Sequence, residues 1–276
     1  MKTIVTRTLT GIVFIAIIIG GICLSIYSFM AVFLLVSVLG LLEFYKLAES
    51  DTAQPQRING IVFGSFLFLS VALVAHGILD AKFLLLNLLL AFTIFIIEMY
   101  RKKEHPLHNI AITLMGVFYI ALPLSILNFF YSPFQSTGEF NTHILIAFFT
   151  ITWLVDTAAY LVGMAIGRHR LFERISPKKS WEGSVGGFVM GIITAWVLSL
   201  IFKDLQFYQW AIISVIITVS GGFGDLVESM FKRSVNTKDT GTLLPGHGGI
   251  LDRFDCVFFS APFVYVYIHF FITQSL

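Results

Sequence analysis

Charged residues are scarce in this chain. Only 12% of the 276 residues are Asp, Glu, Lys or Arg, about half the share that is usual in soluble domains. So few charges cannot coat a water-facing surface, whereas 57% of the residues are hydrophobic and the mean hydropathy is +0.87. The composition therefore argues against a soluble globular domain and favours the bilayer as solvent. The net charge of +2 is small, and we expect no nucleic-acid partner.

Cysteine is almost absent as well. Cys23 and Cys256 lie far apart, each within an apolar run. They cannot form a disulfide framework or a paired-cysteine metal site. We interpret both as small buried hydrophobic residues.

Long apolar runs are what the sequence has in abundance. About 20 apolar residues are needed to cross a bilayer as a helix. The first run follows Lys2 and Arg7 and resembles a secretory signal, but it is long and lacks a small-x-small cleavage site, so we predict an uncleaved helix. The fold class is therefore predicted to be all-α and polytopic, with about nine transmembrane helices over 9–27, 29–47, 58–77, 81–100, 110–131, 143–166, 184–202, 208–228 and 256–273.

The distribution of basic residues predicts the orientation. With nine spans, all but two of the 18 Lys and Arg residues fall on the side of the N-terminus, the exceptions being Lys82 and Lys203. Basic residues accumulate in cytoplasmic loops. We therefore predict a cytoplasmic N-terminus and a C-terminus on the opposite side. Polar residues gather from Asp156 onward, and we divide the chain into N-terminal transmembrane helices (1–140) and a catalytic transmembrane region (141–276).

The segment GGFGDLVES carries the first polar cluster. Asp225, Glu228 and Ser229 are spaced three and four residues apart, which places them on one helix face. The preceding glycines allow a close backbone approach or an unwound turn. Ionisable residues within a membrane span are costly and usually functional. The structural alternative is a helix end that simply reaches water.

The segment GGILDRFD carries the second cluster, where the last apolar helix begins. Asp252 and Asp255 are three residues apart, with Arg253 between them. Carboxylates from two helix ends could hold Mg²⁺, which also binds phosphate oxygens of a substrate. The structural alternative is helix capping by Asp252, with Arg253 as an interfacial anchor.

Basic and glycine-rich stretches supply a phosphate-binding character. Lys232, Arg233 and Lys238 precede the loop PGHGG, which contains His247. Glycine loops let backbone N–H groups approach an anion. The stretch ISPKKSWEG, with Lys178 and Lys179, opens the seventh span after a turn at Ser-Pro, and a helix N-terminus binds phosphate. Both stretches could instead be ordinary basic loops on the cytoplasmic side.

Asp156 is a carboxylate near the middle of the sixth predicted span. It could bind a metal, line a water-filled cleft or pair with a lysine. A buried structural ion pair is the alternative.

The order of residues from 229 to 255 is more specific than any of these pieces. It resembles the signature of the phosphatidate cytidylyltransferases, also called CDP-diacylglycerol synthases. Upstream, GDLVES, the series Asp156, Ala159, Tyr160 and Gly163, and the stretch 175–183 resemble further family elements; Lys179 matches the family's lysine, and Lys178 stands where glycine is usual. The signature positions are Ser229, Lys232, Arg233, Lys238, Asp239, Gly241, Pro245, His247, Gly248, Gly249, Asp252, Arg253 and Asp255.

The resemblance implies the reaction of CTP with phosphatidate to give CDP-diacylglycerol and diphosphate, in phospholipid biosynthesis at the cell membrane. It implies Mg²⁺ held by Asp225 and Asp252 with Asp255 or Glu228, allows a second cation and a homodimer, and predicts an active site facing the cytoplasm and surrounded by membrane lipids. The implied phosphate-binding residues are Lys179, Lys232, Arg233, Lys238 and Arg253, with Gly248, Gly249 and Asp239 near the nucleotide, Asp156 and Ser229 lining the cleft, and His247 donating to the leaving group.

Two other functions remain open from the sequence. A CTP-dependent lipid kinase, or a cytidylyltransferase for another lipid phosphate, would use the same ions and nucleotide; label from α-labelled CTP enters the lipid only in cytidylyl transfer. A transporter would use membrane carboxylates along an ion pathway. The polar residues, however, cluster at one face and do not cross the membrane.

Overall fold

The part of the chain that the structure describes is helical apart from one short hairpin and the connecting loops. A computed structural model describes residues 2–131, 141–237, 240–241 and 248–272, with side chains from residue 9 onward. Within this part of the chain, eight helical segments are long and apolar enough to cross a membrane, and the first helix adds the apolar stretch Leu9–Leu24. The predicted all-α polytopic membrane fold is therefore confirmed, and each of the nine predicted spans overlaps a helical segment.

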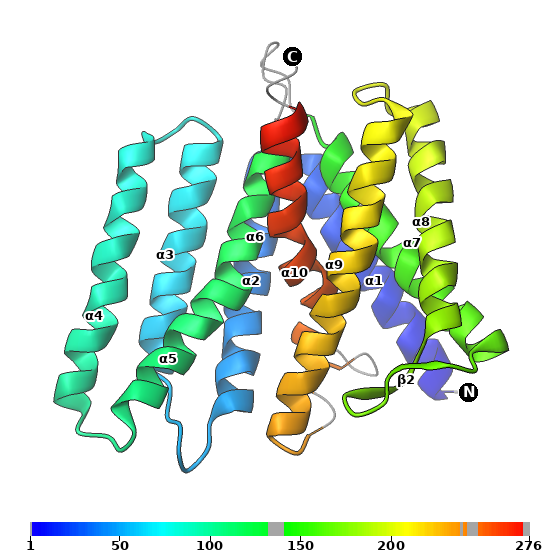
Figure 1. The fold of residues 1–276 in the computed structure, drawn as a ribbon. Coiled ribbons are helices and arrows are strands. Elements are labelled where there is room, and N and C mark those ends of the chain that lie inside the picture. The colour runs from blue at the N-terminus through cyan, green and yellow to red at the C-terminus, as the bar shows by residue number, and fades with distance from the viewer. Residues whose placement is uncertain (1, 132–140, 238–239, 242–247, 273–276) are drawn as a thin grey trace. The chain divides into compact units, whose positions relative to one another are not determined.

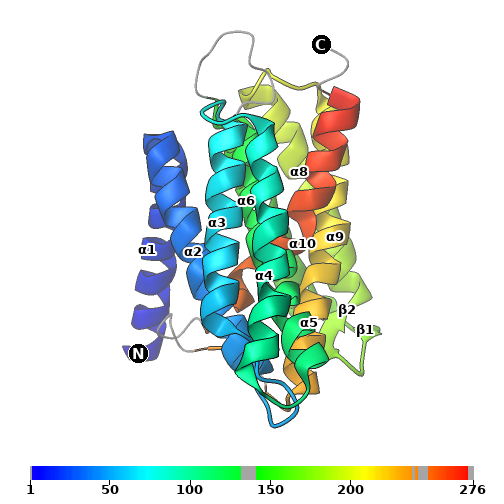
Figure 2. The same ribbon diagram turned by 90° about the vertical axis from the view of Figure 1, so that its left-hand side faces the viewer.

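The chain separates into two compact units. The first unit comprises 1–129 and 235–254. Helices α1 and α2 run side by side in it, as do α3 and α4 (Figure 2). Its helices are α1 (Lys2–Leu24), α2 (Ile26–Ala48), α3 (Arg57–Ala75), α4 (Leu86–Arg101, after a 3-10 turn over Ala81–Leu85), α5 (Pro106–Gly116) and α6 (Leu122–Ile126), with a π-turn (Val117–Ala121) between the last two.

A single residue separates α1 from α2. Ser25 has an extended backbone and caps α2. Its hydroxyl accepts the Ser28 N–H at 3.0 Å, and the Ser28 hydroxyl accepts the Ser25 N–H at 2.9 Å. Reciprocal caps of this kind satisfy two N–H groups that the start of a helix leaves without partners. The predicted turn near Ser28 is thus a capping box that ends one span and starts the next.

Tyr45 of α2 fills a slot between two glycines in this unit. A Cβ atom on Gly60 of α3 would lie 2.6 Å from the Tyr45 Cζ, and one on Gly116 of α5 would lie 2.6 Å from its Cε1. The phenol donates to the carbonyl of Thr113 at 2.7 Å. Small residues let membrane helices approach closely, so these glycines make room for a fully buried aromatic side chain.

A buried carboxylate ties α4 to the ends of α3 and α5. Glu98 is 4% exposed and accepts hydrogen bonds from Gln56 at 2.6 Å, Asn109 at 2.7 Å and Arg101 at 2.7 Å. Buried charges persist when they are paired and hydrogen-bonded. Glu98 is therefore a structural junction of the first unit.

The second unit comprises 130–234 and 255–276. Helix α8 packs against both α7 and α9, and the hairpin lies at one end of these helices (Figure 1). The elements that supply this unit are α7 (His143–Ile166), β1 (Arg170–Phe172), β2 (Ser176–Ser180), α8 (Trp181–Ile201), α9 (Phe207–Ser234) and α10 (Leu251–Tyr267, followed by a π-turn over Ile268–Ile272), the first turn of α10 belonging to the first unit.

Glycines bring α8 against the backbone of α7. A Cβ atom on Gly183 would lie 2.7 Å from the carbonyl oxygen of Ala159, and one on Gly187 would lie 3.1 Å from that of Val155. The four-residue spacing places both glycines on one face of α8. Any larger residue would push the two helices apart.

The stretch Ser176–Ser180 is a strand, which the sequence analysis did not predict. The turn expected at Ser-Pro lies one step earlier, over 173–175, and α8 starts at Trp181 rather than 184. Two local interactions account for this: the Ser180 hydroxyl caps α8 by accepting the Gly183 N–H at 3.2 Å, and Glu182 holds the His169 ring at 2.6 Å across the base of the hairpin. Proline is tolerated at the start of an edge strand.

Candidate active site

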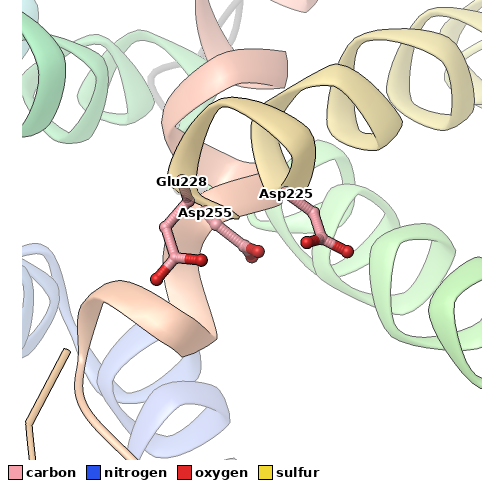
Figure 3. A group of neighbouring side chains, drawn as sticks. All are labelled: Asp225, Glu228 and Asp255. Atoms are coloured by element: carbon pink, nitrogen blue, oxygen red, sulfur yellow. The ribbon is translucent and has the colours of Figure 1, made fainter. Parts of the chain in front are cut away.

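Three carboxylates meet where α9 and α10 pack together in the second unit. Asp225 and Glu228 come from successive turns of α9, and Asp255 comes from α10; each offers an oxygen, and these oxygens lie within 4.8 Å of one another. Figure 3 shows the three side chains pointing into the same space. Glu228 is 2% exposed. The structure thus brings together three of the four predicted metal ligands.

A glycine makes this meeting possible. A Cβ atom on Gly224 would lie 2.4 Å from the carbonyl oxygen of Asp255 and 2.8 Å from the Cβ of Phe259. Helix α9 is continuous through Phe207–Ser234, so the predicted close backbone approach is present and the alternative of an unwound turn is not. The backbone of α9 at Gly224 packs against the backbone of α10 at Asp255, where the carboxylates of the two helices converge.

Two lysines flank the carboxylates. Lys179, the last-but-one residue of β2, places its Nζ 2.7 Å from the Asp225 Oδ2 and 3.2 Å from the Gly222 carbonyl oxygen. Lys232, one turn beyond Glu228, places its Nζ 2.5 Å from the Glu228 Oε2. The hairpin therefore places the Lys179 ammonium group against α9, whereas Lys232 and its partner Glu228 belong to the same helix.

The donor set suits a divalent cation. Unit charges about 4 Å apart repel each other strongly where water is excluded. Three carboxylates face two ammonium groups here, so negative charge is in excess and the carboxylate oxygens are hard ligands of the kind that Mg²⁺ prefers. The group can accept a cation without any further acidic residue.

Three other residues border this cluster. Ser229 donates to the Asp225 Oδ1 at 3.2 Å. The Cys256 thiol lies 3.6 and 3.7 Å from the two oxygens of Asp156, and the Cys256 N–H donates to the Asp255 Oδ1 at 2.7 Å. Asp156 is exposed on α7. Cys256 is buried as predicted, whereas Cys23 is exposed, so the prediction of burial is wrong for Cys23. The contact of Cys256 with Asp156 was not predicted from the sequence, although its position directly after Asp255 places it beside the cluster.

Apart from Arg233, the remaining described signature residues lie in the first unit. Asp252, in the first turn of α10, accepts the Thr240 hydroxyl and the Gly249 N–H on its Oδ2, each at 2.9 Å. Gly248 has a φ of +82°, and a Cβ atom there would lie 2.7 Å from the same oxygen. Glycine adopts this left-handed backbone conformation without steric cost. Gly248 can therefore form the tight turn around the Asp252 carboxylate.

Glu43 of α2 is the group that the sequence analysis missed. It is 5% exposed, and its Oε2 accepts the Leu251 N–H at 3.0 Å. No partner for its Oε1 is found among the described residues. The sequence offered a signal for it, since a lone carboxylate inside a predicted membrane span is usually functional.

Other predicted residues are not part of these two groups. Arg233 is exposed in the last turn of α9, and Arg253 is exposed in the first turn of α10. Lys178 is exposed on β2 beside the half-buried Lys179. Lys238, Asp239 and His247 lie outside the described residues.

Known proteins resemble the chain over almost its whole length. A model described as "Cytidylyltransferase family" matches residues 5–271. A phosphatidate cytidylyltransferase of Staphylococcus haemolyticus is 31% identical over 264 residues, covering 93% of this chain and 95% of the relative. One of Staphylococcus aureus is 33% identical with the same coverage, and one of Synechocystis is 31% identical, covering 95% of each chain.

Proposed function

Because the chain belongs to the cytidylyltransferase family, we propose that it is a phosphatidate cytidylyltransferase that makes CDP-diacylglycerol from CTP and phosphatidate. The observation that carries this proposal is the carboxylate cluster on α9 and α10 with Lys179 and Lys232 against it. Its acidic and basic groups suit a reaction between two anions at a metal ion.

The proposed reaction joins two phosphates. An oxygen of the phosphatidate phosphate attacks the α-phosphorus of CTP, a new P–O bond forms, and the bond to the bridging oxygen of the β-phosphate breaks, releasing diphosphate. The nucleophile is already ionised at neutral pH, so the protein needs no base. Positioning and charge neutralisation carry most catalysis of this type.

We assign metal binding to Asp225, Glu228 and Asp255, which supply the excess negative charge. When bound, Mg²⁺ would neutralise phosphate charge and orient the triphosphate. Asp252 as a further ligand, a second cation and a homodimer stay predictions from the family resemblance.

We assign phosphate binding to Lys179 and Lys232. Each now pairs with a carboxylate of the cluster, so each would exchange that partner for a phosphate oxygen as the cation takes over the carboxylates. Arg233, Lys238 and Arg253 are proposed to bind the outer phosphates, with Asp239, His247 and the turn at Gly248 and Gly249 beside the nucleotide.

The proposed orientation of the protein in the membrane is based on the distribution of Lys and Arg residues. We place the active site at the cytoplasmic face, where CTP is available, and the lipid chains among the helices of the second region (141–276). The helices of 1–140 would then serve as the supporting region. Cysteine labelling of Lys103→Cys against Lys203→Cys in inverted and right-side-out vesicles tests this orientation, since the two exposed positions should label from opposite sides.

The function is tested by turnover of the purified protein. With α-labelled CTP, phosphatidate and Mg²⁺, label should enter the lipid, and it should stay in water-soluble compounds when Mg²⁺ is chelated. Label transferred from γ-labelled CTP instead would indicate a lipid kinase. If neither the α-label nor the γ-label enters the lipid, the proposal is refuted.

Adjacent lysines on β2 give a matched pair of variants. Lys179→Met is expected to lower kcat about 10²-fold, the usual cost of removing one charge-stabilising group, because Lys179 reaches the carboxylate cluster. Lys178→Met should stay within about twofold of the parent rate, since Lys178 is exposed on the same strand. Equal losses in both variants would show that the general positive charge of the hairpin matters, and not the specific contact of Lys179.

A further inference from the structure

Glu43 lies against two glycines of the signature segment (229–255), Gly241 and Gly249. A Cβ atom on Gly241 would come within 2.6 Å of the Glu43 Oε1, and one on Gly249 within 2.4 Å of its Oε2. The same side chain accepts the Leu251 N–H at 3.0 Å. A carboxylate from α2 thus contacts the chain at Gly241, at Gly249 and at the first residue of α10.

The contact with Leu251 is of the kind that fixes a helix start. Leu251 is the first residue of α10, and the first N–H groups of a helix have no partner within it. A carboxylate there is favoured by the helix dipole as well as by the hydrogen bond. Glu43 therefore acts as a cap that is supplied from a different helix, 208 residues away in sequence.

The effect reaches Asp252 through a short chain of contacts. Gly249 touches the Glu43 carboxylate and donates its N–H to the Asp252 Oδ2 at 2.9 Å. Thr240, whose hydroxyl would be 2.5 Å from a Cβ atom on Gly249, donates to the same Asp252 oxygen at 2.9 Å. The two donors to Asp252, the Thr240 hydroxyl and the Gly249 N–H, thus lie beside the Glu43 carboxylate.

We propose that Glu43 is a positioning residue that fixes the start of α10 and thereby the carboxylate of Asp252. The proposal rests on the proposed function in one respect: Asp252 is taken as a residue of the cation-dependent reaction. Groups that orient metal ligands typically change metal affinity or activity by 10–100-fold. Glu43 itself does not touch a substrate in this assignment.

Hydrogen exchange and Mg²⁺ dependence of the purified full-length protein test this role. Glu43→Ala should speed amide exchange over 250–252 and raise the Mg²⁺ concentration for half-maximal rate about tenfold or more. Glu43→Gln should restore part of both, because its amide oxygen can still accept the Leu251 N–H. The matched control is Leu41→Ala, a fully buried residue of the same helix, which should lower the thermal midpoint without changing the Mg²⁺ requirement.

Two results would overturn the proposal. One is a Mg²⁺ requirement in Glu43→Ala that equals that of the parent protein. The other is a loss of activity and exchange protection that merely matches Leu41→Ala, because that pattern indicates general destabilisation. The exchange measurement needs no turnover, so a parent protein that fails to label lipid from CTP would refute the proposed function and still leave the cap itself testable.

Discussion

Replacing Asp225 with asparagine is expected to lower cytidylyl transfer by at least about 10³-fold while the protein stays folded. Asp225 is the carboxylate that joins the cluster to Lys179, at 2.7 Å, and it accepts the Ser229 hydroxyl on its other oxygen. A bound metal ion contributes several kcal/mol of charge stabilisation, and each 1.36 kcal/mol is a factor of ten in rate. An amide keeps the shape of the side chain but removes the charge that the cation needs.

The measurement is single-turnover transfer from α-labelled CTP over a range of Mg²⁺ concentrations. Asp51→Asn is a suitable control, since Asp51 is exposed in the turn after α2. The rate of this variant should stay within about twofold of the parent rate. Thermal unfolding in detergent separates a folded, inactive protein from an unfolded one. A folded Asp225→Asn protein with the parent's Mg²⁺-dependent rate would rule out the proposed metal site.

Gly224→Ala is expected to disrupt the packing of α9 against α10 in the second unit. The added Cβ would lie 2.4 Å from the Asp255 carbonyl oxygen and 2.8 Å from the Phe259 Cβ. A backbone oxygen cannot turn aside as a flexible side chain can, so α9 and α10 must separate. Overpacking of this kind costs about 1–3 kcal/mol of stability, and a shift of about 1 Å at catalytic groups can lower activity about 10²-fold.

Gly222→Ala supplies the matched control two residues away. A Cβ atom on Gly222 would meet nothing within 4 Å. Within a helix, alanine is more favourable than glycine by about 1 kcal/mol. This variant should keep its activity and unfold at the same or a higher temperature. If Gly224→Ala behaved like Gly222→Ala, the close contact between α9 and α10 would not be needed for the carboxylates to meet.

The spans were predictable because each depends on local composition. A run of apolar residues with few charges needs a helix wherever it crosses lipid, since every backbone N–H must be bonded within the segment. The common face of Asp225 and Glu228 was predictable in the same way, because residues three apart in a helix are neighbours on its surface. These features depend on neighbours within a few residues of each other along the chain.

The features that were missed depend on partners distant in sequence. Glu43 looks like one carboxylate in an apolar run until Gly241, Gly249 and Leu251 pack around it. The strand Ser176–Ser180 depends on pairing with Arg170–Phe172 and on Glu182 closing the base of the hairpin. Lys179 was matched to the family lysine, but nothing in its neighbourhood along the chain indicates that it reaches Asp225.

The hydrogen bond from Leu251 to Glu43 also constrains the order in which the protein is made. Its two residues are 208 apart, and translation adds about 5–20 residues per second. Helix α2 therefore leaves the ribosome about 10–40 s before the start of α10. The first turn of α10 is therefore completed against a carboxylate that was synthesised well before it.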